Sequence, residues 1–180
     1  MTRLAITSTI LGAAMIAGRL PGVIDPAKFS QRAQEFPRSA LWGRILMAIC
    51  ALWAAIVMYN AATDDWAWAK PLVVIGMPVA YWLVIQYANQ FLALRGLAAL
   101  LLLIAKAALD AADLSELPLR LVVTVLAYLW VCAAMWMAGA PHQVRDIIGF
   151  MTANPIRCRV SCIVGAAIGA LLVALGLFVY

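Results

Sequence analysis

Charged residues are scarce in this sequence, and long stretches contain none. The 180-residue chain has 13 Lys and Arg, 8 Asp and Glu and 1 His, whereas 67% of its residues are hydrophobic. Most of the charges fall between apolar stretches of the roughly 20 residues needed to cross about 30 Å of hydrocarbon. This hydropathy excludes a soluble fold, and a membrane β-barrel would show short alternating segments instead of unbroken apolar runs. We therefore predict an all-α, polytopic transmembrane helix bundle.

Residues suited to catalysis or metal binding are also few. The single histidine, His142, cannot build a His-rich metal site, and beside Pro141 we interpret it as a solvated interfacial residue. Cys158 and Cys162 lie four residues apart, but with His142 they offer only three soft ligands where zinc takes four. The sequence has no Gly-rich phosphate loop, no Ser/His/Asp set and no paired carboxylates. We predict no metal and no cofactor, and the sequence favours a non-catalytic protein over an enzyme.

Several apolar segments are long enough to span a membrane. In chain order they are Leu4–Ile24, Ala40–Asn60, Pro71–Tyr87, Phe91–Ala112, Leu117–Ala140 and Val160–Tyr180. A single helix from the start of the third segment to the end of the fourth would be about 60 Å long, too long for one crossing. We predict a tight hairpin there, with a half-inserted third segment as the alternative. The six spans leave room only for short loops, so residues 1–180 form one membrane domain.

The basic residues are concentrated on one side of the predicted spans. Several of them lie in the loops after the first and fifth spans or at the adjoining helix ends. We expect six of these to contact lipid headgroups: Lys28, Arg32, Arg44, Arg145, Arg157 and Arg159. The positive-inside rule then places both termini outside and the basic loops in the cytoplasm, most simply at a bacterial plasma (inner) membrane. The basic residues are too dispersed among short loops to indicate nucleic-acid binding.

Two parts of the chain share a pattern when the sequence is shifted by 115 residues. Pro26 then falls on Pro141, and Arg44 falls on Arg159. In both loops, apolar residues spaced by four and then three mark one helical face: Phe29, Ala33 and Phe36, and Val144, Ile148 and Met151. We predict two short amphipathic helices lying in the membrane interface. Duplication of residues 4–60 as 119–175, joined by a hairpin at 71–112, is one hypothesis; convergence of any hairpin with an interfacial loop is the other.

Two further patterns mark candidate sites. Gly165 and Gly169 form a GxxxG pair in the last span, which predicts close packing against another helix. The third span, interrupted by Gly76 and Pro78, leads into a cluster of neutral polar groups: Tyr81, Gln86, Asn89 and Gln90. A broken helix with such groups can form a substrate site. It can also be a kinked packing helix whose Gln and Asn side chains dock on a neighbour.

These features favour a non-catalytic integral membrane subunit or scaffold of a larger membrane protein assembly. Its partners would be membrane lipids and other membrane subunits, or further copies of the same chain. A small transporter or channel for a neutral solute or lipid is the alternative, supported by the repeat and the broken third span. A membrane enzyme is supported least.

Labelling of introduced cysteines tests the orientation. In a variant lacking the native cysteines, Asp65→Cys and Glu116→Cys should react with a membrane-impermeant thiol reagent added from outside. Arg32→Cys and Arg145→Cys should not react, because the two sets of loops lie on opposite sides of the membrane. The reverse labelling pattern would contradict the orientation.

Overall fold

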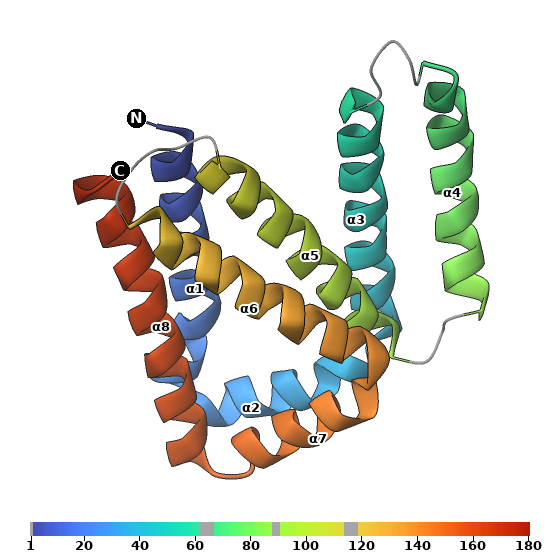
Figure 1. Cartoon of the computed structure of the whole chain (residues 1–180). Coiled ribbons are helices and arrows are strands. Elements are labelled where there is room, and N and C mark those ends of the chain that lie inside the picture. The colour runs from blue at the N-terminus through green and yellow to red at the C-terminus, as the bar shows by residue number, and fades with distance from the viewer. Residues whose placement is uncertain (1, 62–66, 88–90, 114–118) are drawn as a thin grey trace.

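All the regular secondary structure in the described part of the chain is helical. The computed structural model describes residues 2–61, 67–87, 91–113 and 119–180. Its elements are α1 (Arg3–Ile24), α2 (Pro26–Glu35), the 3-10 helix η1 (Phe36–Arg38), α3 (Ala40–Ala61), α4 (Ala69–Tyr87), α5 (Leu92–Asp113), α6 (Arg120–Gly139), α7 (Pro141–Thr152) and α8 (Pro155–Phe178). Within those ranges, six helices, α1, α3, α4, α5, α6 and α8, are long and apolar enough to cross a membrane (Figure 1). The predicted polytopic helix bundle is confirmed, and α4 and α5 are separate helices.

The last span begins earlier than the sequence pattern predicts, at Pro155 instead of Val160. The Asn154 side chain accepts a backbone hydrogen bond at 2.9 Å, and proline suits the first helical turn because its missing N–H has no partner there. Arg157 and Arg159 therefore belong to the first turns of α8 and not to a loop. The predicted fifth span likewise differs, since α6 begins at Arg120 and the residues at 114–118 lie outside the described ranges.

α1 and α8 run antiparallel and form the most extensive helix pair. Their contact depends on glycine: a Cβ atom added to Gly169 would lie 2.8 Å from the carbonyl oxygen of Gly12. A Cβ on Gly176 would lie 2.7 Å from the hydroxyl oxygen of Ser8, and one on Gly165 would lie 3.1 Å from the guanidinium of Arg19. Helices in lipid gain little from the hydrophobic effect on pairing, so this close contact supplies the attraction.

Hydrogen bonds join the two ends of the described chain. The hydroxyl of Thr2 donates to the carbonyl oxygen of Tyr180 at 2.9 Å, and the hydroxyl of Tyr180 donates to the carbonyl oxygen of Leu119 at 2.6 Å. At the opposite end of the helix pair, Nε of Arg159 donates to the carbonyl oxygen of Val23 at 3.2 Å. Both ends of the chain therefore lie at the same end of the bundle (Figure 1).

α5 crosses the molecule from α3 to the α1–α8 pair. Buried residues make up 39% of its spanning window, the largest share among the six spans. Near its start, Gly96 lies against α3, where an added Cβ would be 2.9 Å from the Cβ of Leu46. Its second half shares a buried cluster with α1, α6 and α8, made of Leu4, Ala105, Ala108, Ala111, Ala112, Val123, Ala127 and Leu172. α5 thus connects the two sides of the bundle.

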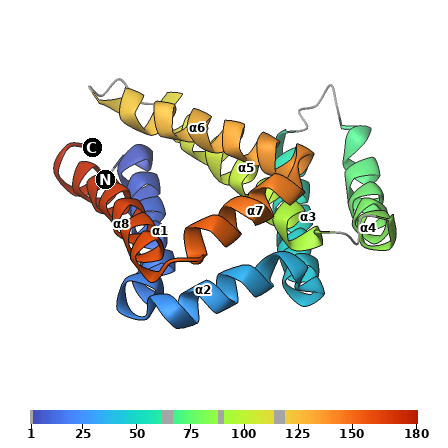
Figure 2. The same ribbon diagram turned by 90° about the horizontal axis from the view of Figure 1, so that it is seen from below.

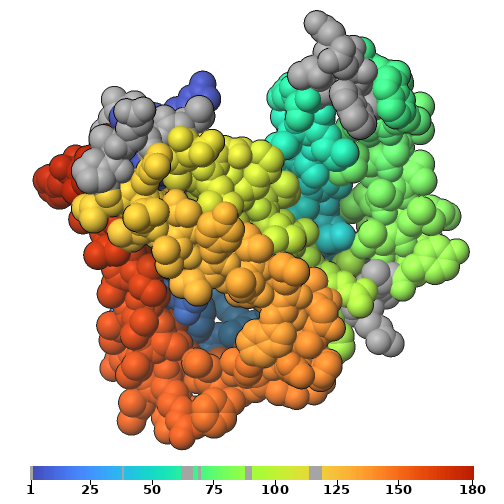
Figure 3. All heavy atoms as spheres, viewed as in Figure 1, coloured from blue at the N-terminus to red at the C-terminus, as the bar shows by residue number. Residues whose placement is uncertain are grey.

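The two short helices α2 and α7 lie side by side across the end of the bundle opposite the termini (Figures 1 and 2). Gln34 on α2 donates from Nε2 to the hydroxyl of Thr152 on α7 at 2.8 Å. Beside them, the molecular surface is hollowed between α6, α7 and α8, with α1 and α2 behind the opening (Figure 3). Of the apolar residues expected at the interface, Phe29, Phe36 and Ile148 are half-buried within the protein, and Met151 is exposed.

The turns into α2 and α7, here called the first and second elbows, have the same backbone form. Asp25 has φ −132° and ψ 82°, and Ala140, 115 positions later, has φ −131° and ψ 62°. Each donates its N–H to the carbonyl four residues earlier, at 3.0 Å to Pro21 and 2.9 Å to Trp136. The shared geometry at the shared offset is consistent with a duplicated unit, which stays a hypothesis.

Paired glycine substitutions on α1 test the close packing. Gly12→Ala should lower the thermal unfolding temperature, because overpacking costs about 1–3 kcal/mol. Gly18→Ala is the matched control, since an added Cβ at Gly18 meets no atom within 4 Å. It should raise stability by roughly 0.5–1 kcal/mol, because alanine is the better helix former. Equal stability of the two variants in detergent would contradict the packing.

Candidate functional site

A groove of about 340 Å³ lies between α3, α4 and α5. Four alanines narrow its walls and leave room between the helices: Ala51, Ala54, Ala80 and Ala99. Two polar side chains also line it, and both are bonded within the protein. The Tyr81 hydroxyl donates to the carbonyl oxygen of Arg44 at 3.4 Å, and the Cys50 thiol donates to the carbonyl oxygen of Gly96 at 3.5 Å. The groove therefore presents apolar surface to an occupant.

α4 is the least packed of the spans. No residue of its spanning window is buried, and among the described elements it packs extensively only against α3. It stands beside the rest of the bundle in Figure 1, joined to it through α3. Large apolar side chains of α4 are exposed to the surroundings, among them Leu72, Ile75 and Trp82. Lipid or another protein must cover this surface in a membrane.

The polar cluster predicted in the third span divides in the structure. Tyr81 lies at the groove, whereas Gln86 is exposed on α4 and is not part of the groove lining. Tyr81 and Gln86 are five residues apart, which is well over one turn of an α-helix. Their side chains therefore lie on different faces of α4. Asn89 and Gln90 lie outside the described residues. The two described residues of the cluster, Tyr81 and Gln86, therefore do not line one polar pocket together.

A second groove, of about 550 Å³, lies in the first elbow, between α1 and α2. The α1 wall is one apolar helical face made of Ala17, Leu20, Pro21 and Ile24, and the α2 wall is made of Asp25, Lys28, Phe29 and Arg32. Glycine makes the bend compact, because a Cβ on Gly22 would lie 3.0 Å from the ring of Phe29. An apolar wall here meets two cationic side chains.

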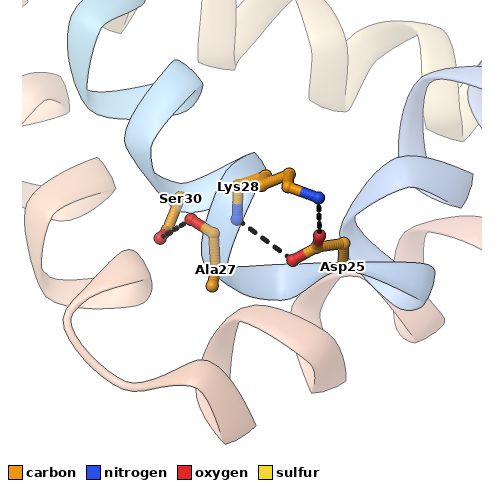
Figure 4. A network of polar contacts seen from close by, with 4 residues as sticks. All are labelled: Asp25, Ala27, Lys28 and Ser30. Atoms are coloured by element: carbon orange, nitrogen blue, oxygen red, sulfur yellow. Dashed lines mark hydrogen bonds and ion pairs between the residues drawn. The ribbon is translucent and has the colours of Figure 1, made fainter.

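Asp25 fixes the first elbow by capping α2. Its Oδ1 accepts the backbone N–H of Lys28 at 3.2 Å, and its Oδ2 pairs with the Lys28 ammonium at 2.9 Å (Figure 4). The hydrogen bond from the Lys28 side chain, followed by that from its backbone N–H, holds the pKa of Asp25 below its ordinary value. In the next turn, the Ser30 hydroxyl donates to the carbonyl oxygen of Ala27 at 2.8 Å. Asp25 therefore remains ionised and paired at neutral pH.

The structure places all six residues expected to contact headgroups toward the α2–α7 end, but in different settings. Arg145 pairs with Asp146 at 2.8 Å and lies 5.9 Å from the ring centre of Phe91. Arg157 lies 4.6 Å from the ring centre of Phe150. Arg159 is bonded to α1, and Arg44 is exposed on α3. Lys28 and Arg32 are the two of the six that line the apolar elbow groove.

Sequence reasoning missed the α1 side of the α1–α8 interface and the elbow groove. Ala5, Ser8 and Gly12 are small, buried and spaced by three and four residues, which is the signal of a packing face. The sequence of α1 thus already contained the pattern of the face that packs against Gly165 and Gly169. The elbow groove had no such signal, because it depends on how α2 folds back on α1.

No known family, curated protein or solved structure matches this chain. Within the described ranges, no three His, Cys, Asp or Glu side chains gather in a way that would hold a metal ion. Cys158 and Cys162 are buried in α8. The two grooves and the exposed face of α4 are therefore the features from which function is inferred.

Proposed function

We propose that this chain is a non-catalytic integral membrane subunit that acts as a scaffold in a larger membrane protein assembly. It accepts an apolar transmembrane helix of a partner in the groove between α3, α4 and α5. The observation that supports this most is the unburied α4 beside an apolar, alanine-walled groove. Its partner is another membrane subunit or a second copy of the chain.

The physical basis is the way helices associate in lipid. Attraction there comes from close packing of small residues, because lipid tails are as apolar as the side chains they would replace. The chain already uses this mechanism between α1 and α8, at Gly12 and Gly169. Ala54 on α3 and Ala99 on α5 offer the same kind of surface in the groove. A partner helix would gain close contact there that lipid chains supply poorly.

A small transporter or channel is the second candidate, supported by the two similar elbows. The groove favours the scaffold, because its lining contains no charged side chain and its tyrosine hydroxyl already has an acceptor. Lys106, on α5, lies 2.5 Å from Asp110 in an exposed pair and does not line the groove. Substrate coupling by ions normally needs ionisable groups inside the spans.

We also propose that the protein resides in a bacterial plasma membrane, with both termini outside and with α2 and α7 at the cytoplasmic face. The basic residues at the α2–α7 end, including Lys28, Arg32 and Arg145, support this placement through the positive-inside rule. The positions expected to be labelled from outside, Asp65 and Glu116, lie outside the described ranges.

Filling the groove tests the scaffold role. Ala54→Leu should reduce stoichiometric co-purification of a partner membrane protein by about tenfold or more, because the added bulk overpacks an occupied groove. Affinity purification in mild detergent from the native host, with quantitative mass spectrometry, measures this.

Ala48→Leu is the matched control, because Ala48 is exposed on the same helix and does not line the groove. It should leave partner recovery unchanged. Isolation of the wild type as a lone monomer stabilised by a neutral solute would contradict the scaffold and favour the transporter. Equal recovery with both variants would contradict the groove as the docking site.

A further inference from the structure

The first elbow groove has the shape of a site at the boundary between hydrocarbon and headgroups. Its α1 wall belongs to a membrane span, and Leu20 and Ile24 on that wall are 46% and 76% exposed. Its α2 wall belongs to a short amphipathic helix that crosses the end of the bundle (Figure 2). A molecule in the groove would therefore contact apolar side chains at one end and charged side chains at the other.

The charged end of the groove is cationic. Lys28 and Arg32 contribute two positive charges, and Asp25 contributes one negative charge, which leaves one positive charge. The Lys28–Asp25 pair is exposed, with 78% of the Lys28 side chain accessible, so its ammonium can turn to a second anion at little cost. The Arg32 side chain is exposed one turn further along α2. Both suit a phosphate group.

A proline interrupts the helical hydrogen bonds along the apolar wall. Pro21 lies inside α1 and has no N–H, so it cannot donate to the carbonyl oxygen of Ala17 four residues earlier. Ala17 and Pro21 both line the groove.

The second elbow shows that these features are not required by the turn itself. It has nearly the same backbone angles, yet the positions equivalent to Lys28 and Arg32 hold Gln143 and Ile147. The position equivalent to Pro21 holds Trp136, whose ring nitrogen donates to the side-chain oxygen of Gln143 at 2.9 Å. The two cations and the proline are thus specific to the first elbow.

From these observations we propose that the first elbow binds one anionic glycerophospholipid. An acyl chain lies along the α1 face from Ala17 to Ile24, and the phosphate lies between Lys28 and Arg32. This site is separate from the groove between α3, α4 and α5, and it stands whether or not a partner helix occupies that groove.

Native mass spectrometry of the full chain in detergent, with added phosphatidylglycerol or phosphatidylcholine, tests the site. The wild type should retain one phosphatidylglycerol and should unfold at a higher temperature with it than with phosphatidylcholine. The double variant Lys28→Gln, Arg32→Gln should lose this retention by about tenfold, because each basic residue near an anionic lipid contributes a few-fold. Arg44→Gln with Arg157→Gln removes the same charge from the same end of the bundle and should retain the lipid.

A further variant separates lipid binding from folding and from simple anion binding. Ala17→Phe fills the apolar wall but keeps both cations, and it should lose phosphatidylglycerol while its unfolding temperature in phosphatidylcholine stays that of the wild type. Equal loss in both double variants would show diffuse attraction to anionic lipid and overturn the site. Displacement of phosphatidylglycerol by inorganic phosphate at equal concentration, or unchanged retention in Ala17→Phe, would show a free-anion site and overturn the lipid as occupant.

Discussion

Close approach of α1 and α8 at glycine is the contact on which the rest of the structure depends. These helices come from opposite ends of the chain, and their pairing brings Thr2 to Tyr180 at one end of the bundle. At the other end it sets the directions in which α2 and α7 leave the pair, and these meet side by side. A larger residue at Gly12 or Gly169 would separate the backbones and open both ends together.

Close packing at small residues also explains why the side of the molecule formed by α1, α5, α6 and α8 is closed, whereas the side formed by α3 and α4 is open. α5 is rich in alanine where it meets α1, α6 and α8, and its small side chains allow those helices to pack closely. α4 has no comparable partner beyond α3, and its spanning residues remain unburied. We propose that the open side binds another membrane protein and that the first elbow is a separate surface for lipid.

The sequence predicted the membrane fold and most helix boundaries, because span length and charge placement act locally along the chain. Pro26 and Pro141 marked the starts of α2 and α7 for the same reason. The start of α8 was missed, because the cap at Asn154 outweighed the charges of Arg157 and Arg159. The sequence pattern also could not predict which helices pair. Gly165 and Gly169 indicated a packing face, but not that α1 would cover it. The grooves arise from that pairing and from the angle between α1 and α2, so no single segment encodes them.

Disulfide cross-linking in native membranes tests the central contact most directly. In a variant without the native cysteines, Thr2→Cys and Tyr180→Cys should form an intramolecular disulfide under mild oxidation, since the Thr2 hydroxyl oxygen lies 2.9 Å from the Tyr180 carbonyl oxygen. Such a bond needs Cβ atoms about 3.5–4.5 Å apart. The control pair Ile10→Cys and Leu177→Cys, at positions 61% and 52% exposed, should not cross-link. Absence of the first cross-link, or equal yields from both pairs, would contradict the pairing of α1 with α8.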